Sequence, residues 1–163
     1  GTVAEVDGFG TSLARYDVIS EFDDAPDPVL DAALVSLDLG ERWERSPNEL
    51  HAIQAARFDL TSLRFADLRV EFMLTGSAVV LLEPDRSAPL RIEVSPDKLA
   101  FGTCELAREQ GQPSALERRG GELSLHSGRE QRRCPLPGAY RRFGLAFEVA
   151  ADARISALRL MRE

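Results

Sequence analysis

The sequence predicts an all-β protein in which two antiparallel sheets pack face to face as a β-sandwich, a single domain over residues 1–163. Three segments alternate apolar and polar residues, which places successive side chains on opposite faces of a strand. Their apolar residues form inward stripes at 68–74, 90–94 and 143–149. The turns between strands are too short for the helical crossovers that parallel pairing needs. The 44% content of hydrophobic residues is enough to build one core.

At most one short helix is expected, near residues 28–38. Asp27-Pro28 is a suitable helix start, Gly40 is a suitable stop, and leucines recur between them at helical spacing. The same stretch also alternates in the manner of a strand, so a strand is the alternative interpretation.

The remaining elements are expected to be strands joined by turns. Thr75-Gly76-Ser77 is predicted to close a hairpin between strands 67–74 and 78–82. Residues 108–121, rich in Gly, Gln and charged residues, are predicted to form a loop. The other predicted strands are 90–95, 99–106, 122–126, 143–149 and 154–161.

The charge distribution argues against a nucleic-acid or membrane-surface protein. The net charge is −7, and affinity for phosphate-rich partners comes largely from cationic side chains. The arginines that flank Tyr140, from Arg129 to Arg142, carry the one local argument for nucleic acid, and the acidic remainder outweighs it. No window approaches the roughly 18 uninterrupted apolar residues of a membrane span. Lys98 is the only lysine, a bias typical of a GC-rich bacterial genome.

Two cysteines, Cys104 and Cys134, lie 30 positions apart. They can form one disulfide, worth on the order of 3 kcal/mol, or remain two buried thiols. Neither belongs to a Cys-x-x-Cys pair or a Cys/His cluster, so a structural zinc site is not expected. An extracytoplasmic location is slightly favoured.

Two stretches of the chain resemble a known class of domains. The run from Trp43 through Asn48-Glu49-Leu50-His51-Ala52 to residues 65–72 resembles the opening of concanavalin-like jelly-roll domains, the laminin-G-like and glycosidase-associated class. Residues 142–149, a turn and then 155–160 resemble their last paired strands. The resemblance implies a β-sandwich of jelly-roll type. The Glu-x-Asp-x-x-Glu constellation of laminarinase-type glycosidases is absent, which argues against that activity.

The polar faces of two predicted strands supply the first candidate site residues, Arg69, Glu71, Arg91 and Glu93. Two carboxylates held roughly 5–9 Å apart can hydrolyse glycosides, so a shared sheet surface carrying Glu71 and Glu93 would be a catalytic candidate. Cross-strand pairing alone also favours alternating Arg and Glu on a solvated sheet, and we favour that interpretation.

Aromatic and acidic residues supply further candidates. Trp43 and Tyr140 are the loop-side residues that could stack on a sugar. A lone tryptophan in a sandwich also suits the core, and for Trp43 we favour that interpretation. A cluster of three acidic residues precedes the expected helix and could either bind calcium or cap that helix. Its members are Asp23, Asp24 and Asp27. His51 and His126 lack the neighbours of a nucleophilic site and are expected at the surface or at a strand edge.

These observations favour a non-catalytic binding or interaction module, accessory to a larger or extracytoplasmic protein, with a carbohydrate or a protein as its partner. No cofactor is expected apart from the calcium alternative. Two other functions stay open: a glycosidase-like jelly-roll enzyme acting on sugars, and a structural or oligomerisation domain.

Overall fold

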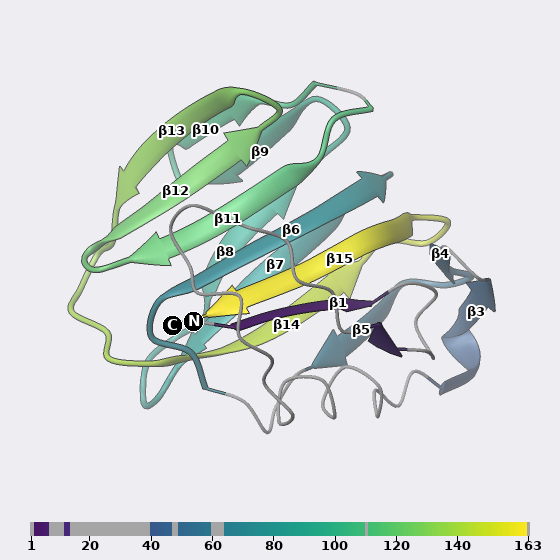
Figure 1. Ribbon diagram of the computed structural model, residues 1–163, viewed down its shortest axis with the longest axis horizontal. Coiled ribbons are helices and arrows are strands. Elements are labelled where there is room, and N and C mark those ends of the chain that lie inside the picture. The colour runs from purple at the N-terminus through teal and green to yellow at the C-terminus, as the bar shows by residue number, and fades with distance from the viewer. Residues whose placement is uncertain are drawn as a thin grey trace.

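The computed structural model describes residues 2–6, 12–13, 40–46, 49–59, 64–109 and 111–162. These residues form two antiparallel sheets packed face to face, and Figure 1 looks onto the larger sheet with the smaller one behind it. The predicted all-β sandwich is therefore confirmed. The helix expected near 28–38 lies outside the described residues. Within them the one helical element is the short 3-10 turn η1 (Gly40–Arg42).

The larger sheet has nine strands and the smaller has six. Across the larger sheet the order is β13 (Glu130–Pro135), β12 (Glu122–Ser127), β11 (Ser114–Arg119), β6 (Leu68–Thr75), β15 (Arg154–Arg162), β1 (Thr2–Val6) and β2 (Ser12–Leu13). Two more strands join its β15 side, β4 (Glu49–Ala52) and β3 (Trp43–Ser46). Across the smaller sheet the order is β10 (Cys104–Ala107), β9 (Lys98–Phe101), β8 (Leu90–Val94), β7 (Ala78–Pro84), β14 (Phe143–Val149) and β5 (Ala56–Asp59).

The three predicted inward stripes form the core between the sheets. Every second residue of β6, β8 and β14 is buried, from Leu68 to Leu74, Leu90 to Val94 and Phe143 to Val149. Phe147 lies at the centre of an aromatic cluster, with its ring centroid 4.9 Å from Phe58 and 5.8 Å from Phe72. Alternation therefore identified both the strands and the faces they bury.

The turn at Thr75-Gly76-Ser77 does not close a hairpin, so that prediction is wrong. β6 belongs to the larger sheet and β7 to the smaller one, and the turn carries the chain from one sheet to the other. Gly76 has φ +95°, a backbone conformation that residues other than glycine rarely adopt. A Cβ built at Gly76 would lie 3.0 Å from Cβ of Ala153, so the turn and the loop before β15 leave no room for a side chain.

Two further boundaries differ from the predictions. Residues 114–119, expected within a loop, form β11, which pairs with β6 on one side and β12 on the other. The predicted strand 99–106 is divided into β9 and β10 by a turn at Gly102, where φ is +60°. A strand in the middle of a sheet is supported by neighbours on both sides, so its own sequence can be polar.

A disulfide joins Cys104 of β10 to Cys134 of β13, with 6.0 Å between the two Cα atoms. β10 is the last strand of the smaller sheet and β13 is the last strand of the larger sheet at the same side of the sandwich. The bridge therefore links the two layers at this edge, where Figure 1 shows β10 and β13 at the same side of the sandwich.

Arg118 ties three segments together at the end of the sandwich. Its guanidinium donates to the main-chain oxygens of Ala66 at 2.9 Å and Tyr140 at 2.6 Å. Its Cζ also lies 5.3 Å from the centre of the Phe143 ring, a cation–π distance. No helix in the described part of the chain has the length and apolar character to cross a membrane.

Candidate functional site

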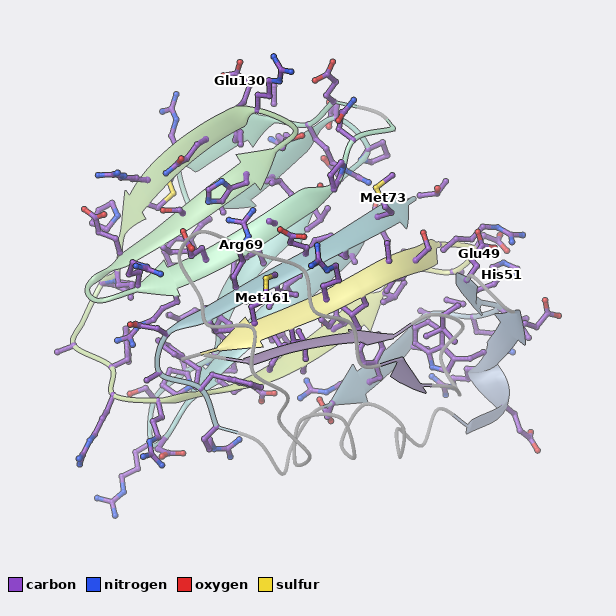
Figure 2. All side chains as sticks on the ribbon, in the orientation of Figure 1. Glu49, His51, Arg69, Met73, Glu130 and Met161 are labelled. Atoms are coloured by element: carbon purple, nitrogen blue, oxygen red, sulfur yellow. A yellow bond between two sulfur atoms is a disulfide. The ribbon has the colours of Figure 1, made fainter. Side chains whose placement is uncertain are left out.

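The outer face of the larger sheet carries two rows of side chains that cross the strands. Antiparallel pairing sets neighbouring residues of five strands side by side on one face. The first row, from β13 to β15, is Arg133, Ser124, Glu117, Arg69 and Met161. The second row is Gln131, His126, Ala115, Glu71 and Arg159. Figure 2 shows Arg69 and Met161 beside each other on this sheet.

A network of charged side chains occupies the middle of these rows. Arg69 Nε lies 2.9 Å from Oε1 of Glu71, and Arg159 Nη1 lies 3.2 Å from the other oxygen of the same carboxylate. Arg69 Nη1 also lies 4.0 Å from Glu117, whose second oxygen is 3.8 Å from His126 Nε2. The network thus joins side chains of β6, β11, β12 and β15.

These charges are sheltered from water although they lie on the outer side of the sheet. None of the five side chains is more than 20% exposed, and Glu117 is only 8% exposed. Met161, in the same row as Arg69, is fully buried. Charge-assisted hydrogen bonds are stronger in such an environment than on an open surface.

A hollow of about 220 Å³ adjoins the network on the side of β13. It is open to solvent through exposed side chains of β11, β12 and β13, and Ser124 and Glu117 form its buried part. The lining residues are Glu117, Arg119, Glu122, Ser124, Gln131 and Arg133. All of them can donate or accept hydrogen bonds, so the hollow suits a polar ligand.

The predicted site residues of the two sheets do not share a surface. Arg69 and Glu71 are in the network, whereas Arg91 and Glu93 are on β8, in the smaller sheet, and face solvent on the opposite side of the sandwich. The expected common surface for Glu71 and Glu93 is therefore wrong, because the turn at Gly76 changes sheets. Arg91 is 54% exposed and lies 4.0 Å from Glu148, an ordinary surface ion pair.

The two aromatic candidates lie elsewhere. Trp43 is 7% exposed and packs edge-on against Phe58, 5.7 Å between ring centres, so it belongs to the core and offers no stacking surface. Tyr140 is partly buried beside Phe143 and lines a separate hollow of about 360 Å³, together with Arg118 and Arg141. Tyr140 is therefore not next to the network.

Of the remaining candidates, only His51 lies within the described residues, and it lies outside the network. His51 on β4 lies 3.3 Å from Glu44 and 3.5 Å from Asp152. Figure 2 places His51 at the opposite end of the sheet from Arg69. The calcium candidates Asp23, Asp24 and Asp27 lie outside the described residues. Within the described ranges, no three His, Cys, Asp or Glu side chains are grouped to hold a metal ion.

Sequence reasoning missed most of the network. It singled out Arg69 and Glu71 because they alternate with core residues, but it left out Glu117 and Arg159 and gave His126 no role. Glu117 lies in the segment expected to be a loop. Only the register of β6, β11, β12 and β15 brings these residues together, and register is a property of pairing between distant segments.

The outer face of the smaller sheet holds a second charged cluster, centred on Arg57. Its guanidinium lies 2.7 Å from both Asp59 and Glu83, and 3.4 Å from Glu148. Burial lowers the pKa of Arg57, but the hydrogen bond to Asp59 and the charges of the three carboxylates outweigh this and raise it. The cluster is a saturated set of ion pairs between β5, β7 and β14, and it has a structural role.

A third hollow, of about 300 Å³, lies beside the turn at Gly76. Arg108 reaches across it, donating to the main-chain oxygens of Ser95, at 2.7 Å, and Leu74. Burial lowers the pKa of Arg108. Its contacts hold the β10–β11 connection against the ends of β6 and β8, which makes it an anchor for the fold.

Neither a protein-family model nor a curated protein sequence matches the chain. Solved structures do match. Two are proposed glycosyl hydrolases from Parabacteroides distasonis, both with a TM-score of 0.57. The first is 7% identical in sequence, and the match covers 76% of this chain and 84% of that protein's chain. The second is 9% identical, and the match covers 84% of this chain and 98% of that protein's chain. The exoplasmic/lumenal domain of VIP36, bound to Ca²⁺ and Man3GlcNAc, is 9% identical, with a TM-score of 0.52. That match covers 78% of this chain and 83% of the VIP36 chain.

These likenesses establish the fold. The chain has a jelly-roll β-sandwich fold, and the resemblance drawn from Trp43, residues 65–72 and residues 142–149 is confirmed at the level of the fold.

Proposed function

We propose that residues 1–163 form a single carbohydrate-binding module without catalytic activity, which holds a saccharide on the outer face of the larger sheet. The observation that carries this proposal is the sheltered network of Arg69, Glu71, Glu117, His126 and Arg159, which leads into the solvent-open hollow beside β13. Carboxylates and guanidinium groups hydrogen-bond to neighbouring sugar hydroxyls with defined geometry.

Two observations support a rigid site of this kind. The site residues project from paired strands of a sheet rather than from loops, and strands position side chains more accurately. The fold is shared with a lumenal domain whose structure holds Man3GlcNAc and with two proposed glycosyl hydrolases, so sugar recognition is compatible with this scaffold. Fold alone does not assign a function, and the site carries the argument.

The disulfide supports an extracytoplasmic location. Disulfides persist in oxidising compartments and are rare in the cytosol of mesophiles, where thiols are kept reduced. Cys104 and Cys134 are the only cysteines of the chain, and both are in the bridge. Glycans exposed on cell surfaces or in secreted material are the ligands available in such a compartment.

An enzyme acting on sugars is the second candidate. Arg69 contacts both Glu71 and Glu117, so two carboxylates do lie on one surface, as glycoside hydrolysis requires. A binding module leaves its saccharide intact, whereas an enzyme releases new reducing ends. A reducing-end assay on every glycan that binds separates the two.

A glycan array followed by titration calorimetry tests the proposal. We expect the wild-type protein to bind a defined set of glycans. Arg69→Gln should weaken that binding by about tenfold or more, because Arg69 holds the carboxylates of Glu71 and Glu117 in place. Arg91→Gln is the matched control, since Arg91 is on the opposite face of the sandwich. Because Arg69→Gln can also disturb folding, Gln131→Ala, a change at the exposed part of the hollow, gives a second test.

Three results would overturn the proposal. One is the absence of glycan binding both with calcium and with a chelator, which would move the assignment to a protein partner or an oligomerisation role. Another is unchanged affinity in both site variants, and the last is glycan turnover.

The measurements with calcium also test the separate proposal that Asp23, Asp24 and Asp27 bind this ion. If they do, calcium should raise the thermal stability of the wild-type protein, and this rise should be lost when the three residues are replaced by Asn.

A further inference from the structure

We infer that the hollow beside β13 selects a saccharide that carries a carboxylate, such as a uronic or sialic acid residue, and that Arg133 binds that carboxylate. This inference rests on the proposed function and adds the chemical class of the ligand.

Among the described residues of this face, Arg133 is the cation that other residues leave available. Arg69 and Arg159 are both engaged by Glu71, and Arg69 also approaches Glu117. Arg133 makes no side-chain ion pair or hydrogen bond to any residue in the described ranges, and its side chain is exposed at the rim of the hollow. A guanidinium in this position can bind a carboxylate with two parallel hydrogen bonds.

The position of Arg133 is well defined for a residue on an edge strand. It pairs with Ser124, so it continues the row that contains Glu117 and Arg69. The next residue is Cys134, which is buried and bonded to Cys104 of the other sheet. This bridge holds β13 in place, and a ligand group therefore meets Arg133 at a fixed distance from the network.

The described residues of this face do not include the feature that neutral sugars usually need. Neutral saccharides are commonly held by aromatic rings that stack on the sugar, with polar groups around them. Among the described residues of the two rows and of the hollow, there is no Trp, Tyr or Phe. Affinity must then come from charge-assisted hydrogen bonds, and a carboxylated sugar gains most from them.

Two groups in the hollow oppose an anionic ligand, because Glu117 and Glu122 are part of the lining and like charges repel. Glu117 lies between Arg69, at 4.0 Å, and His126, at 3.8 Å. The register partner of Glu122 on β11 is Arg119, which carries the opposite charge and lines the same hollow. Over the network and the hollow together, the arginines exceed the carboxylates by one, and Ser124 and Gln131 can hydrogen-bond the sugar hydroxyls; the arginines are Arg69, Arg119, Arg133 and Arg159, and the carboxylates are those of Glu71, Glu117 and Glu122.

The test compares acidic oligosaccharides with their carboxyl-reduced, neutral counterparts. The probes are short oligomers of galacturonic and mannuronic acid and a sialylated trisaccharide, titrated into wild-type protein, Arg133→Gln and Arg132→Gln. Arg132 carries the same charge on the same strand, but it pairs with Leu125 and projects from the other face. It is therefore the matched control.

We expect at least one acidic probe to bind more tightly than its reduced form. Arg133→Gln should weaken that binding by about ten- to a hundredfold and leave the reduced form unaffected, while Arg132→Gln should change neither. Affinity for the acidic probe should also fall as salt rises.

The outcomes separate this inference from the proposed function. Equal binding of acidic and reduced probes, or an Arg133→Gln variant as tight as wild type, overturns the inference and leaves a carbohydrate-binding module with another specificity. Binding of neutral array glycans alone has the same consequence. A wild-type protein that binds no glycan, acidic or neutral, overturns both.

Discussion

Removal of the Cys104–Cys134 bridge should lower the free energy of unfolding, and the size of the loss depends on the length of the loop that the bridge closes. The two cysteines are separated by 30 residues. In the chain-entropy treatment, closing a loop of this size restricts the unfolded chain by about 3–4 kcal/mol at 25 °C. For a domain of this length each kcal/mol shifts the melting temperature by roughly 2–4 °C, so the expected loss is about 10 °C.

The assay is thermal unfolding followed by circular dichroism on the wild-type protein, with and without a reductant, and on the double variant Cys104→Ala, Cys134→Ala. Alanine is the suitable replacement because Cys134 is buried in the apolar core, where a serine hydroxyl would lose its water. The reductant should lower the melting temperature of the wild type towards that of the variant and leave the variant unchanged. Equal melting temperatures for all samples would refute the reasoning.

Two other substitutions probe features of the fold and are measured by equilibrium urea unfolding. Gly76→Ala should cost about 1–3 kcal/mol, because φ is +95° and the new methyl would meet Ala153 at 3.0 Å. Gly121→Ala, which meets nothing within 4 Å, is its control, and equal losses in the two variants would contradict the strain argument. Arg118→Met should cost about 1–2 kcal/mol, because two main-chain carbonyls lose their donor. Arg141→Met is its control, because Arg141 is exposed and lines the same hollow as Arg118. Equal free energies of unfolding in these two variants would show that the two hydrogen bonds do not contribute to stability.

Local patterns were sufficient to predict the fold class but not the arrangement of the strands. The stripes at 68–74, 90–94 and 143–149 are long enough for alternation to identify strands and their buried faces. β11 was missed because Ser-Ala-Leu-Glu-Arg-Arg does not alternate and follows a Gly-Gln-Pro turn. The turn at Gly76 was misassigned because a Thr-Gly-Ser turn suits a hairpin and a crossing between sheets equally well. Which sheet the next strand joins depends on the remainder of the core.

The candidate site shows the same limit more strongly. Arg69 and Glu71 could be predicted as outward residues, since they alternate with the buried residues of one strand. Their partners Glu117, His126 and Arg159 come from strands 46 or more positions further along the chain, and no local signal connects them. Trp43 could be interpreted in two ways, because its charged neighbours suggest a half-exposed ring whereas a lone tryptophan in a sandwich suits the core. Packing against Phe58 places it in the core.

The position of β15 has a consequence for how the molecule is made. This strand, residues 154–162, pairs with β6 on one side and with β1 and β4 on the other. During synthesis from the N-terminus, β6 is made long before β15. Until β15 is made, the edge of β6 that pairs with β15 has no partner, and the core around Val70 and Phe72 is incomplete. Such an edge invites pairing with another nascent chain. A longer delay between the synthesis of β6 and that of β15 should therefore favour aggregation.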